Sequence, residues 1–466
     1  MSILESGLAH AGLYADPCQF DKIRQSLPPS MVEEALSSAA VQDQRRGGRL
    51  PVAATVGLVI AMALYRPLSI EDVVVRLRLA RPGKRTAVAP SAIPQARDRL
   101  GYLPMQRLFE MHATAEAHAS AGHPEHRWRG LGLYGMDGTS LRTADSPENR
   151  AHFGGHSAGS TRGPSGYPLV RVVGLMALCS HLLAAIRFDT WSASERFLTR
   201  ELWSCIPDWS LTIVDRLFLC AADLIGLHRE GTQRHWLCRA KSNTRWTVLE
   251  QYGPGDWLVE MQVSPEARRR DPTLPRVWRA RAIRYHRRGF RPQILLTSLL
   301  DPEAYPAAEL VALYHKRWEL ELGWDEIKTH MLDNQWTLRS KHPIGVKQEI
   351  WGIAIAYNLV RIEMQRVAIE AGVEPTCISF VRVLGMLRDE LFWWAVTEGR
   401  PLPPYLRALL EELDRLVLRP RRPERRFPRA VKIKMSNFPR KRPTTCPPSP
   451  PRADVKNPSD SERKVA

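Results

Sequence analysis

Two aspartates and one glutamate, each with a suggestive sequence context, are the residues of this chain with the clearest chemical meaning. Two short apolar runs, 131–136 and 210–215, lead to or end on an aspartate, Asp137 and Asp215. Both runs are typical of buried strands, and ligands usually bind at strand ends in α/β sheets. A single aspartate there is more often a cap or turn residue, so neither is specific by itself. The sequence around Glu321 supplies the evidence that distinguishes a functional site from a cap or turn.

The stretch from about 306 to 331 predicts one long helix with a polar face. At offsets of zero, three, seven and fourteen, this face carries Tyr314, Arg317, Glu321 and Lys328. At about 100° per residue, all four lie within a sector of about 60°. A structural face would be apolar, so this one is interpreted as a site. Glu319 and Glu326 project away and are interpreted as solvated charge, whereas Asp325 borders the face and competes with Glu321.

Three carboxylates from separate elements can hold two Mg²⁺ ions, which prefer hard oxygen ligands and keep positions open for water and phosphate. Two ions about 4 Å apart activate the attacking oxygen and stabilise the leaving oxygen of an in-line phosphoryl transfer. Mn²⁺ is expected to substitute. Arg317 and Lys328 would then lie beside phosphate oxygens. An acid pair for glycoside hydrolysis is the alternative, but it leaves these two cations unexplained.

Composition narrows the class of protein. Of the 466 residues, 44% are hydrophobic and 25% charged, which excludes full-length disorder and a collagen-like fibre. The net charge of +18 indicates a polyanionic partner, nucleic acid before an anionic membrane surface. Seven cysteines without a Cys-x-x-Cys pair indicate no zinc site or disulfide framework. No signal peptide is recognisable, and the apolar stretch 50–68 is interpreted as a buried helix. We therefore expect a cytoplasmic protein without a membrane partner.

Positive charge is concentrated in two segments. The segment 419–466 is rich in proline and basic residues and lacks apolar periodicity, so we expect a largely disordered tail, either functionless or a phosphate-binding arm. In 277–290, arginines alternate with large residues, and strand-like runs surround this segment. An antiparallel sheet with one arginine-lined face is predicted. Its candidate DNA contacts are Trp278, Arg279, Arg281 and Arg284.

The remaining pattern predicts an α/β protein with three parts. Residues 1–125 should form a helical N-terminal domain, either a small bundle or a helix-turn-helix at 69–80 and 91–100. Residues 126–418 should form the α/β catalytic domain, with a β insertion at about 243–300. The tail, 419–466, follows.

These residues resemble the insertion-sequence-four family of bacterial DDE transposases. The family's glutamate helix has a tyrosine, two residues, an arginine, three residues, a glutamate, six residues and a lysine, and the four residues of the polar face fit without a gap. This spacing favours Glu321 over Asp325. The family's first aspartate precedes Gly-Thr, as Asp137 does, and the second precedes Arg-x-Phe, as Asp215 does. Leu217 departs from the glycine common in the family, with no expected loss of chemistry.

The resemblance covers about residues 10–440 and implies a ribonuclease-H-like core interrupted by a β insertion. It implies cut-and-paste transposition through free 3′-hydroxyls, on inverted-repeat ends and target DNA, by a homodimer in the bacterial nucleoid. In the family, the tyrosine, arginine and lysine contact end phosphates, and an insertion-domain aromatic can stack on a flipped base. Trp278 is the candidate, and Trp257 and Trp246 compete with it. An inactive transposase-derived DNA-binding protein and a nuclease without strand transfer remain alternatives.

Overall fold

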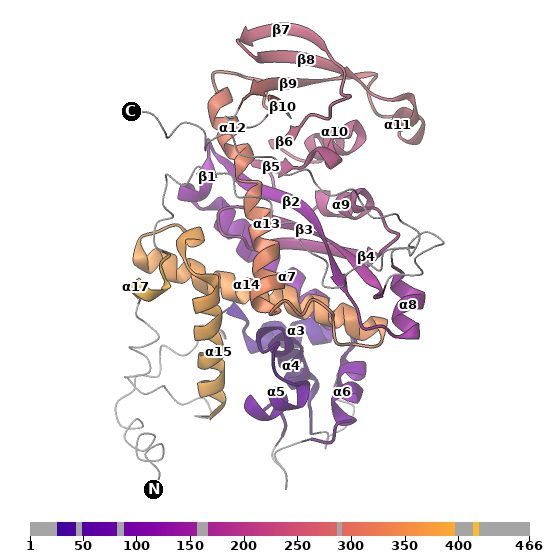
Figure 1. Cartoon of the computed structure of the whole chain (residues 1–466), viewed down its shortest axis with the longest axis vertical. Coiled ribbons are helices and arrows are strands. Elements are labelled where there is room, and N and C mark those ends of the chain that lie inside the picture. Colours follow the sequence, from indigo (N-terminus) through magenta and orange to yellow (C-terminus); the bar gives the residue numbers. More distant parts are fainter. Residues whose placement is uncertain are drawn as a thin grey trace, which may run out of the picture. The chain divides into compact units, whose positions relative to one another are not determined.

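The computed structural model describes most of the chain (Figure 1). The described residues are 26–42, 49–81, 88–155, 166–286, 291–396 and 413–418. Contacts divide the chain into residues 1–418 and residues 419–466. The expected disordered tail, 419–466, lies outside the described residues.

The N-terminal part is helical, as predicted. Its helices are α3 (Pro29–Ser38), α4 (Val52–Leu64), α5 (Ile70–Arg76), α6 (Ala92–Leu100) and α7 (Leu103–Gly122). The apolar stretch 50–68 contains α4, most of which is buried. Among the described residues, no helix has both the length and the apolar character needed to cross a membrane. Since α4 is apolar on nearly every side, it must be covered by other elements.

The ten strands of the described residues belong to one mixed sheet, in the order β4-β3-β2-β5-β6-β10-β9-β8-β7, with β1 paired to β2. They are β1 (Arg127–Trp128), β2 (Leu131–Arg142), β3 (Leu169–Ala177), β4 (Leu183–Thr190), β5 (Ser210–Val214), β6 (Arg234–Arg239), β7 (Thr247–Gly253), β8 (Asp256–Gln262), β9 (Val277–Tyr285) and β10 (Gln293–Thr297). Only β2–β5 and β5–β6 are parallel neighbours. The strands predicted between 243 and 300 extend this sheet, because β10 pairs with β6.

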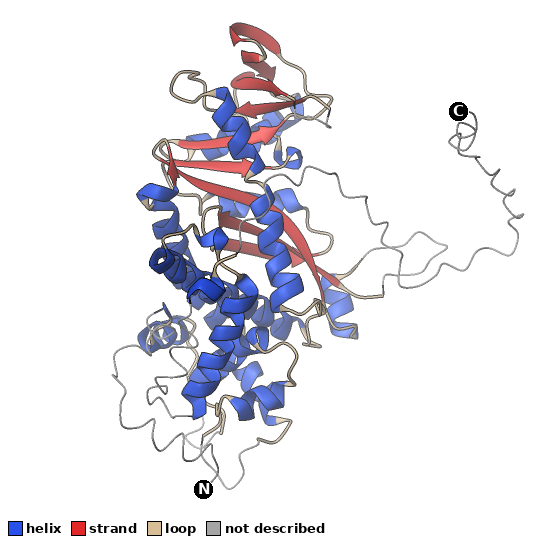
Figure 2. Ribbon diagram, turned by 60° about the vertical axis from the view of Figure 1, so that its left-hand side comes forward, coloured by secondary structure: helices blue, strands red, loops and turns tan. Residues whose placement is uncertain are grey.

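Helices cover both faces of the sheet (Figure 2). The helices that follow the N-terminal part in the sequence, apart from the segment 306–331, are α8 (Pro147–Phe153), α9 (Glu195–Trp203), α10 (Ala221–Arg229), α11 (Pro265–Arg270), α14 (Pro343–Ala371), α15 (Phe380–Val396) and α17 (Leu413–Leu416), with short helical turns at η2 (Pro124–His126), η3 (Arg216–Phe218) and η5 (Pro375–Cys377). A Cβ on Gly135 would lie 2.7 Å from Leu320, and one on Gly138 would lie 2.9 Å from Glu195. Positions 135 and 138 point to opposite faces of β2. The segment carrying Leu320 and α9 therefore approach β2 from opposite sides.

The predicted helix 306–331 is divided into three segments, which corrects the prediction of one continuous helix. They are α12 (Ala307–His315), α13 (Trp318–Asp325) and the π-helical η4 (Glu326–Met331). Between the first two, Arg317 N–H donates to the Tyr314 carbonyl and Leu320 N–H to the Arg317 carbonyl. These i→i+3 bonds tighten the backbone between α12 and α13, whereas the π-helical η4, after α13, has a wider turn than an α-helix. Figure 1 shows α12 and α13 running across the sheet.

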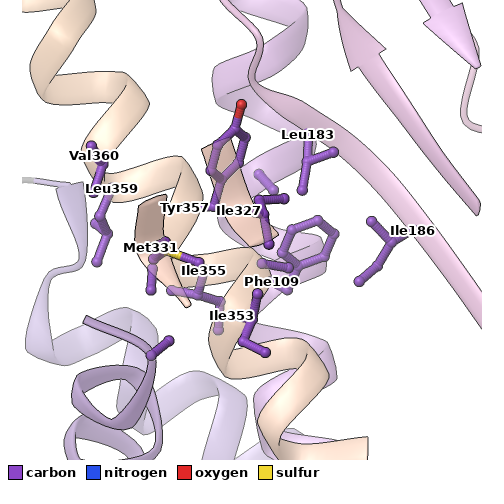
Figure 3. Close-up of a cluster of buried hydrophobic side chains, with 14 of the residues drawn as sticks. Phe109, Leu183, Ile186, Ile327, Met331, Ile353, Ile355, Tyr357, Leu359 and Val360 are labelled. Atoms are coloured by element: carbon purple, nitrogen blue, oxygen red, sulfur yellow. The ribbon is translucent and has the colours of Figure 1, made fainter. Parts of the chain in front are cut away.

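One hydrophobic cluster joins the N-terminal helices to the rest of the protein (Figure 3). In it, Phe109 of α7 packs against Trp351 of α14, with ring centroids 5.3 Å apart. A Cβ on Gly352 would lie 2.8 Å from the backbone oxygen of Val59, so α4 and α14 cross closely at this glycine. The helical N-terminal part and the sheet-covering helices thus share a single core.

Candidate active site

Asp137 and Asp215 lie side by side at neighbouring strands. In the parallel pair β2–β5, Met136 is opposite Val214, and each is followed directly by an aspartate. Asp137 shares a face of the sheet with Gly135, against which α13 packs through Leu320. Asp215 follows β5 and is the N-cap residue of η3. The parallel register brings together two residues that are 78 positions apart in the sequence.

Glu321 and the two aspartates all interact with one side chain, that of Arg317. The Arg317 Nη2 donates to Glu321 Oε1 at 2.8 Å. Burial by itself would lower the pKa of Arg317, but the hydrogen bond to Glu321 and the negative charges nearby, including that of Asp215, raise it. The same guanidinium acts on Asp137, whose carboxyl pKa it lowers. All three carboxylates therefore lie within electrostatic reach of one arginine.

Asp137 has a strongly perturbed carboxyl. Burial raises its pKa to about 6, and the backbone N–H of Gly138 and the charge of Arg317 act in the opposite direction. The charges of Glu321 and Glu195 raise the pKa further. Burial near other carboxylates disfavours the ionised form of Asp137. Carboxyl groups whose pKa is perturbed in this way cluster at functional sites.

Tyr314 and Lys328 complete the signature. Tyr314 is 7% exposed, and burial raises the pKa of its hydroxyl far above the usual value, so it remains a hydrogen-bond donor. Burial lowers the pKa of Lys328, and the charge of Asp137 opposes that shift. Asp325, the competing carboxylate, is exposed and accepts a hydrogen bond from Thr329 in its own helix. The geometry thus connects Glu321, rather than Asp325, with Arg317.

The prediction that Glu319 and Glu326 are solvated charges is wrong. Glu326 is 16% exposed and forms an ion pair with the buried Arg361 of α14, at 3.1 Å. Tyr357 donates to the same carboxylate at 2.8 Å. Glu319 lies 2.9 Å from the buried ring nitrogen Nε2 of His181. Both glutamates do project away from the polar face, but α14 and His181 cover that side, so Glu326 pairs with α14 instead of meeting solvent.

The expectation of one arginine-lined face in the β insertion is also wrong. Arg281 is 1% exposed and donates to both carboxylate oxygens of Asp256, at 2.8 and 2.5 Å. Its guanidinium is buried in an ion pair inside the protein and is not available to DNA. Along β9, Arg279 and Arg284 fall on opposite faces, because side chains alternate. Both remain exposed.

The tryptophans near the site differ in exposure. Trp278 is half-buried and packs against Trp236, with ring centroids 5.5 Å apart. Trp246 and Trp257 are half-buried in the same region. Trp318, which follows Arg317 directly, is 57% exposed. Sequence reasoning missed it, although its helical position, at about 40° on the count that gives Tyr314 0°, borders the polar face.

The donors in this centre suit a hard divalent cation. Among the described residues, no three acidic, histidine or cysteine side chains lie close enough together to form a ready-made metal site. Asp137, Asp215 and Glu321 nevertheless supply carboxylate oxygens, which Mg²⁺ prefers. Arg317 places a positive charge among them. The donor set fits metal ions, and the Arg317 guanidinium offsets part of the negative charge of the three carboxylates.

Comparison with known proteins decides the family. A family model for the insertion element 4 transposase N-terminal region matches residues 17–110, and one for the transposase DDE domain matches residues 130–359. The transposase InsG for insertion sequence element IS4 of Escherichia coli (strain K12) is 37% identical over 415 residues, covering 89% of this chain and 92% of the relative. The chain belongs to the insertion-sequence-four family of DDE transposases.

Two further proteins are similar to this transposase. The putative transposase InsZ of Escherichia coli (strain K12) is 34% identical over 228 residues, covering 48% of this chain and 73% of that protein. A cryo-EM structure of a piggyBac transposase synaptic complex with hairpin DNA has a TM-score of 0.41 at 13% identity. That match covers 89% of this chain and 87% of the other.

Family membership establishes the general activity. The protein is a DNA transposase, an enzyme that cleaves DNA strands and transfers them, with chemistry that uses divalent metal ions. The resemblance read from the glutamate helix and the two aspartate contexts is confirmed.

Proposed function

We propose that Asp137, Asp215 and Glu321 are the catalytic carboxylates of cut-and-paste transposition and that they hold two Mg²⁺ ions, replaceable by Mn²⁺. The observation that carries this proposal is their convergence from β2, the end of β5 and α13 on one guanidinium, that of Arg317. When bound, the ions would activate the attacking oxygen and stabilise the leaving oxygen. The transposase would act as a homodimer on inverted-repeat ends and target DNA in the bacterial nucleoid.

We propose a ribonuclease-H-like core for the sheet that carries these residues. The order β4-β3-β2-β5-β6, in which only β3 runs opposite to the others, supports it. In this proposal residues 126–418 form the catalytic domain and 243–300 its β insertion. Residues 1–125 form the N-terminal domain, which reads the DNA ends.

The side chains around the carboxylates have separate roles in this mechanism. Tyr314, a protonated donor, and the two cations Arg317 and Lys328 bind phosphate oxygens next to the cleaved bond. With Glu321 serving as a metal ligand, the Arg317 guanidinium, which donates to Glu321 in this structure, would be free to bind a phosphate oxygen.

Contacts farther from the cleaved bond involve exposed groups. Trp318 is a further candidate to stack on an unpaired base beside the site, because it is exposed and directly follows Arg317 in the sequence. Arg279 and Arg284 are placed to bind DNA at the insertion. Trp278 is less suited to stacking, since its ring already packs against Trp236.

The test compares two isosteric variants, Glu321→Gln and the matched control Asp325→Asn. The substrate is DNA that carries the gene's own flanking sequences, with Mg²⁺ or Mn²⁺. Loss of an orienting partner of a metal ligand costs about 10–100-fold, so loss of the ligand Glu321 should reduce cleavage by more than about 100-fold. Asp325→Asn should cleave like the wild type, and both variants should bind DNA.

Equal loss of binding and cleavage in Glu321→Gln would contradict the assignment of Glu321. Full activity of that variant with loss in Asp325→Asn would transfer the role to Asp325. A wild type that binds but never cuts, under both metals, would identify this chain as an inactive member of its family.

A further inference from the structure

Four side chains next to the candidate site form an alternating series of rings and cations. The Lys328 Nζ lies 5.2 Å from the centroid of the Trp336 ring. The Arg142 Cζ lies 5.0 Å from the same centroid and 5.6 Å from the centroid of the Tyr167 ring. We call Tyr167, Arg142, Trp336 and Lys328 the ring–cation stack. It begins at a residue of the family signature and ends at a tyrosine that is 44% exposed.

The backbone fixes the position of Trp336. Arg142 is the last residue of β2, and its N–H donates to the Trp336 carbonyl at 3.3 Å. The N–H of Leu338 donates to the Arg142 carbonyl at 2.8 Å. From the other side, the buried Arg66 donates to the carbonyls of Gln335, at 2.8 Å, and Thr337. The segment 335–338 is thus held between β2 and the N-terminal helical part.

One end of the ring–cation stack interacts electrostatically with the candidate catalytic centre. Lys328 and Asp137 are close enough that the aspartate opposes the lowering of the Lys328 pKa by burial. Asp137 and Arg142 lie on the same strand, five residues apart. Because side chains alternate along β2, Asp137 and Arg142 leave opposite faces of the strand, and the stack leads from Lys328, next to Asp137, past Trp336 to Arg142 at the end of β2.

The two cations keep their hydrogen-bond donors available. Neither Arg142 nor Lys328 lies within ion-pair distance of a carboxylate among the described residues. A guanidinium that lies over a ring still directs its N–H groups outward in its own plane, ready for a bidentate phosphate contact. Two like charges next to one ring repel each other. A bound anion removes that repulsion.

We propose that the ring–cation stack binds the phosphodiester backbone of the DNA strand that is cleaved, on the side that leads from Asp137 toward Tyr167. Arg142 is a further phosphate-binding residue, and Trp336 is a positioning residue that holds Lys328. The two cations lie within about 10 Å of each other, because each is close to the same ring centroid. At about 3.4 Å of rise per nucleotide, a strand of about three nucleotides spans that length. This proposal rests on the proposed catalytic site.

The phosphate contact of Arg142 is tested by the salt dependence of DNA binding. Wild type, Arg142→Ala and Arg229→Ala are titrated with end DNA in EDTA at several salt concentrations. Arg229, an exposed arginine of α10, is the matched control. Loss of one duplex phosphate contact should reduce the slope of log Kobs against log [salt] by about 0.9. Arg229→Ala should keep the wild-type slope.

An unchanged slope in Arg142→Ala would overturn the role of Arg142. Because the titration contains no metal, its result does not depend on catalysis. Failure of the catalytic proposal would appear elsewhere, as wild-type cleavage that survives Glu321→Gln. The two proposals can therefore fail separately.

The positioning role of Trp336 is tested by single-turnover cleavage at saturating DNA. Trp336→Leu should reduce the cleavage rate about 10-fold, because the Lys328 ammonium would be positioned less accurately beside the phosphate. Trp336→Phe, which keeps a ring, should restore most of it. If Trp336 acts through Lys328, Trp336→Leu should have no further effect in a Lys328→Ala background.

Independent, multiplicative losses in the Trp336→Leu/Lys328→Ala double variant would overturn the positioning role. Equal rates for Trp336→Leu and Trp336→Phe would also overturn it, because the ring face would then be irrelevant. Thermal unfolding of each variant, followed by circular dichroism, ensures that rates are compared where all variants are folded.

Discussion

Replacing Arg361 with methionine should destabilise the transposase strongly, because it leaves a buried carboxylate without its cation. Arg361 is 1% exposed, and its Nη1 lies 3.1 Å from Glu326 Oε1. Its Nε donates to the Ser180 carbonyl at 2.7 Å. Burial alone would raise the pKa of Glu326, but Arg361, together with His181 and Tyr357, holds that pKa below the usual value. Arg361→Met removes the largest of these opposing effects.

The expected loss is about 3–5 kcal/mol of unfolding free energy at pH 7, the usual cost of removing one partner of a buried ion pair. Removing both charges, in Arg361→Met/Glu326→Leu, should recover most of that loss, since well-packed apolar replacements of buried pairs are often neutral. The comparison of single and double variants therefore separates the cost of an isolated charge from the cost of altered packing.

The effect of pH has a defined sign. In the wild type, the lowered pKa of Glu326 stabilises the fold above the unfolded pKa of about 4.3, and this contribution is lost as pH falls through the folded pKa. In Arg361→Met, burial raises the Glu326 pKa, so ionised Glu326 destabilises the fold at neutral pH. The difference between the two proteins should therefore shrink as pH falls toward about 4.

Urea unfolding followed by tryptophan fluorescence, at pH 7 and at pH 5, measures these differences. A double variant that is as unstable as Arg361→Met would refute the reasoning, since the cost would then come from packing. A deficit that does not change between the two pH values would refute the role assigned to the Glu326 charge.

Two further perturbations act on the catalytic centre itself. Because the pKa of Asp137 is raised to about 6, its carboxylate is protonated below that pH. The affinity for Mn²⁺, measured by calorimetric titration, should therefore fall as pH decreases from 7 to 5. An affinity that stays constant over this range would contradict the perturbed pKa. A Cβ on Gly135 would lie 2.7 Å from Leu320, so Gly135→Ala should push α13 off β2, cost about 1–3 kcal/mol and reduce cleavage. Gly122→Ala, whose Cβ would meet nothing within 4 Å, is its control, and equal cleavage by the two variants would contradict the close packing.

The parts of the candidate site that depend on local order could be predicted from the sequence. Asp137 and Asp215 follow apolar runs that form buried strand, and Asp215 does follow the end of β5. The expected strand end at Asp137 is wrong, because β2 continues to Arg142 beyond its apolar run. Arg317 and Glu321 are four residues apart, so one helical turn is enough to bring them into the hydrogen bond that the structure shows. The strands and the N-terminal helices were predictable for the same reason.

The errors arise where distant residues decide the conformation. Glu326 was taken for a solvated charge because the helix that covers its side, with its partner Arg361, lies 35 positions farther along the chain. Arg281 was misplaced because period-two alternation predicts a common face but cannot tell which face meets Asp256 across the β8–β9 pair. No sequence pattern indicated that Trp336 belongs to the ring–cation stack, because its neighbours there come from separate parts of the chain.

The close crossing of α4 and α14 at Gly352 has a consequence for how such genes can evolve. Val59 and Phe109, from the N-terminal part, belong to the same hydrophobic core as Trp351. A recombinant that joins the first 125 residues of a distant relative to the remainder of this chain would inherit mismatched surfaces along α14. The N-terminal part in this lineage should therefore diverge through point mutations at exposed positions, while its wholesale exchange is selected against.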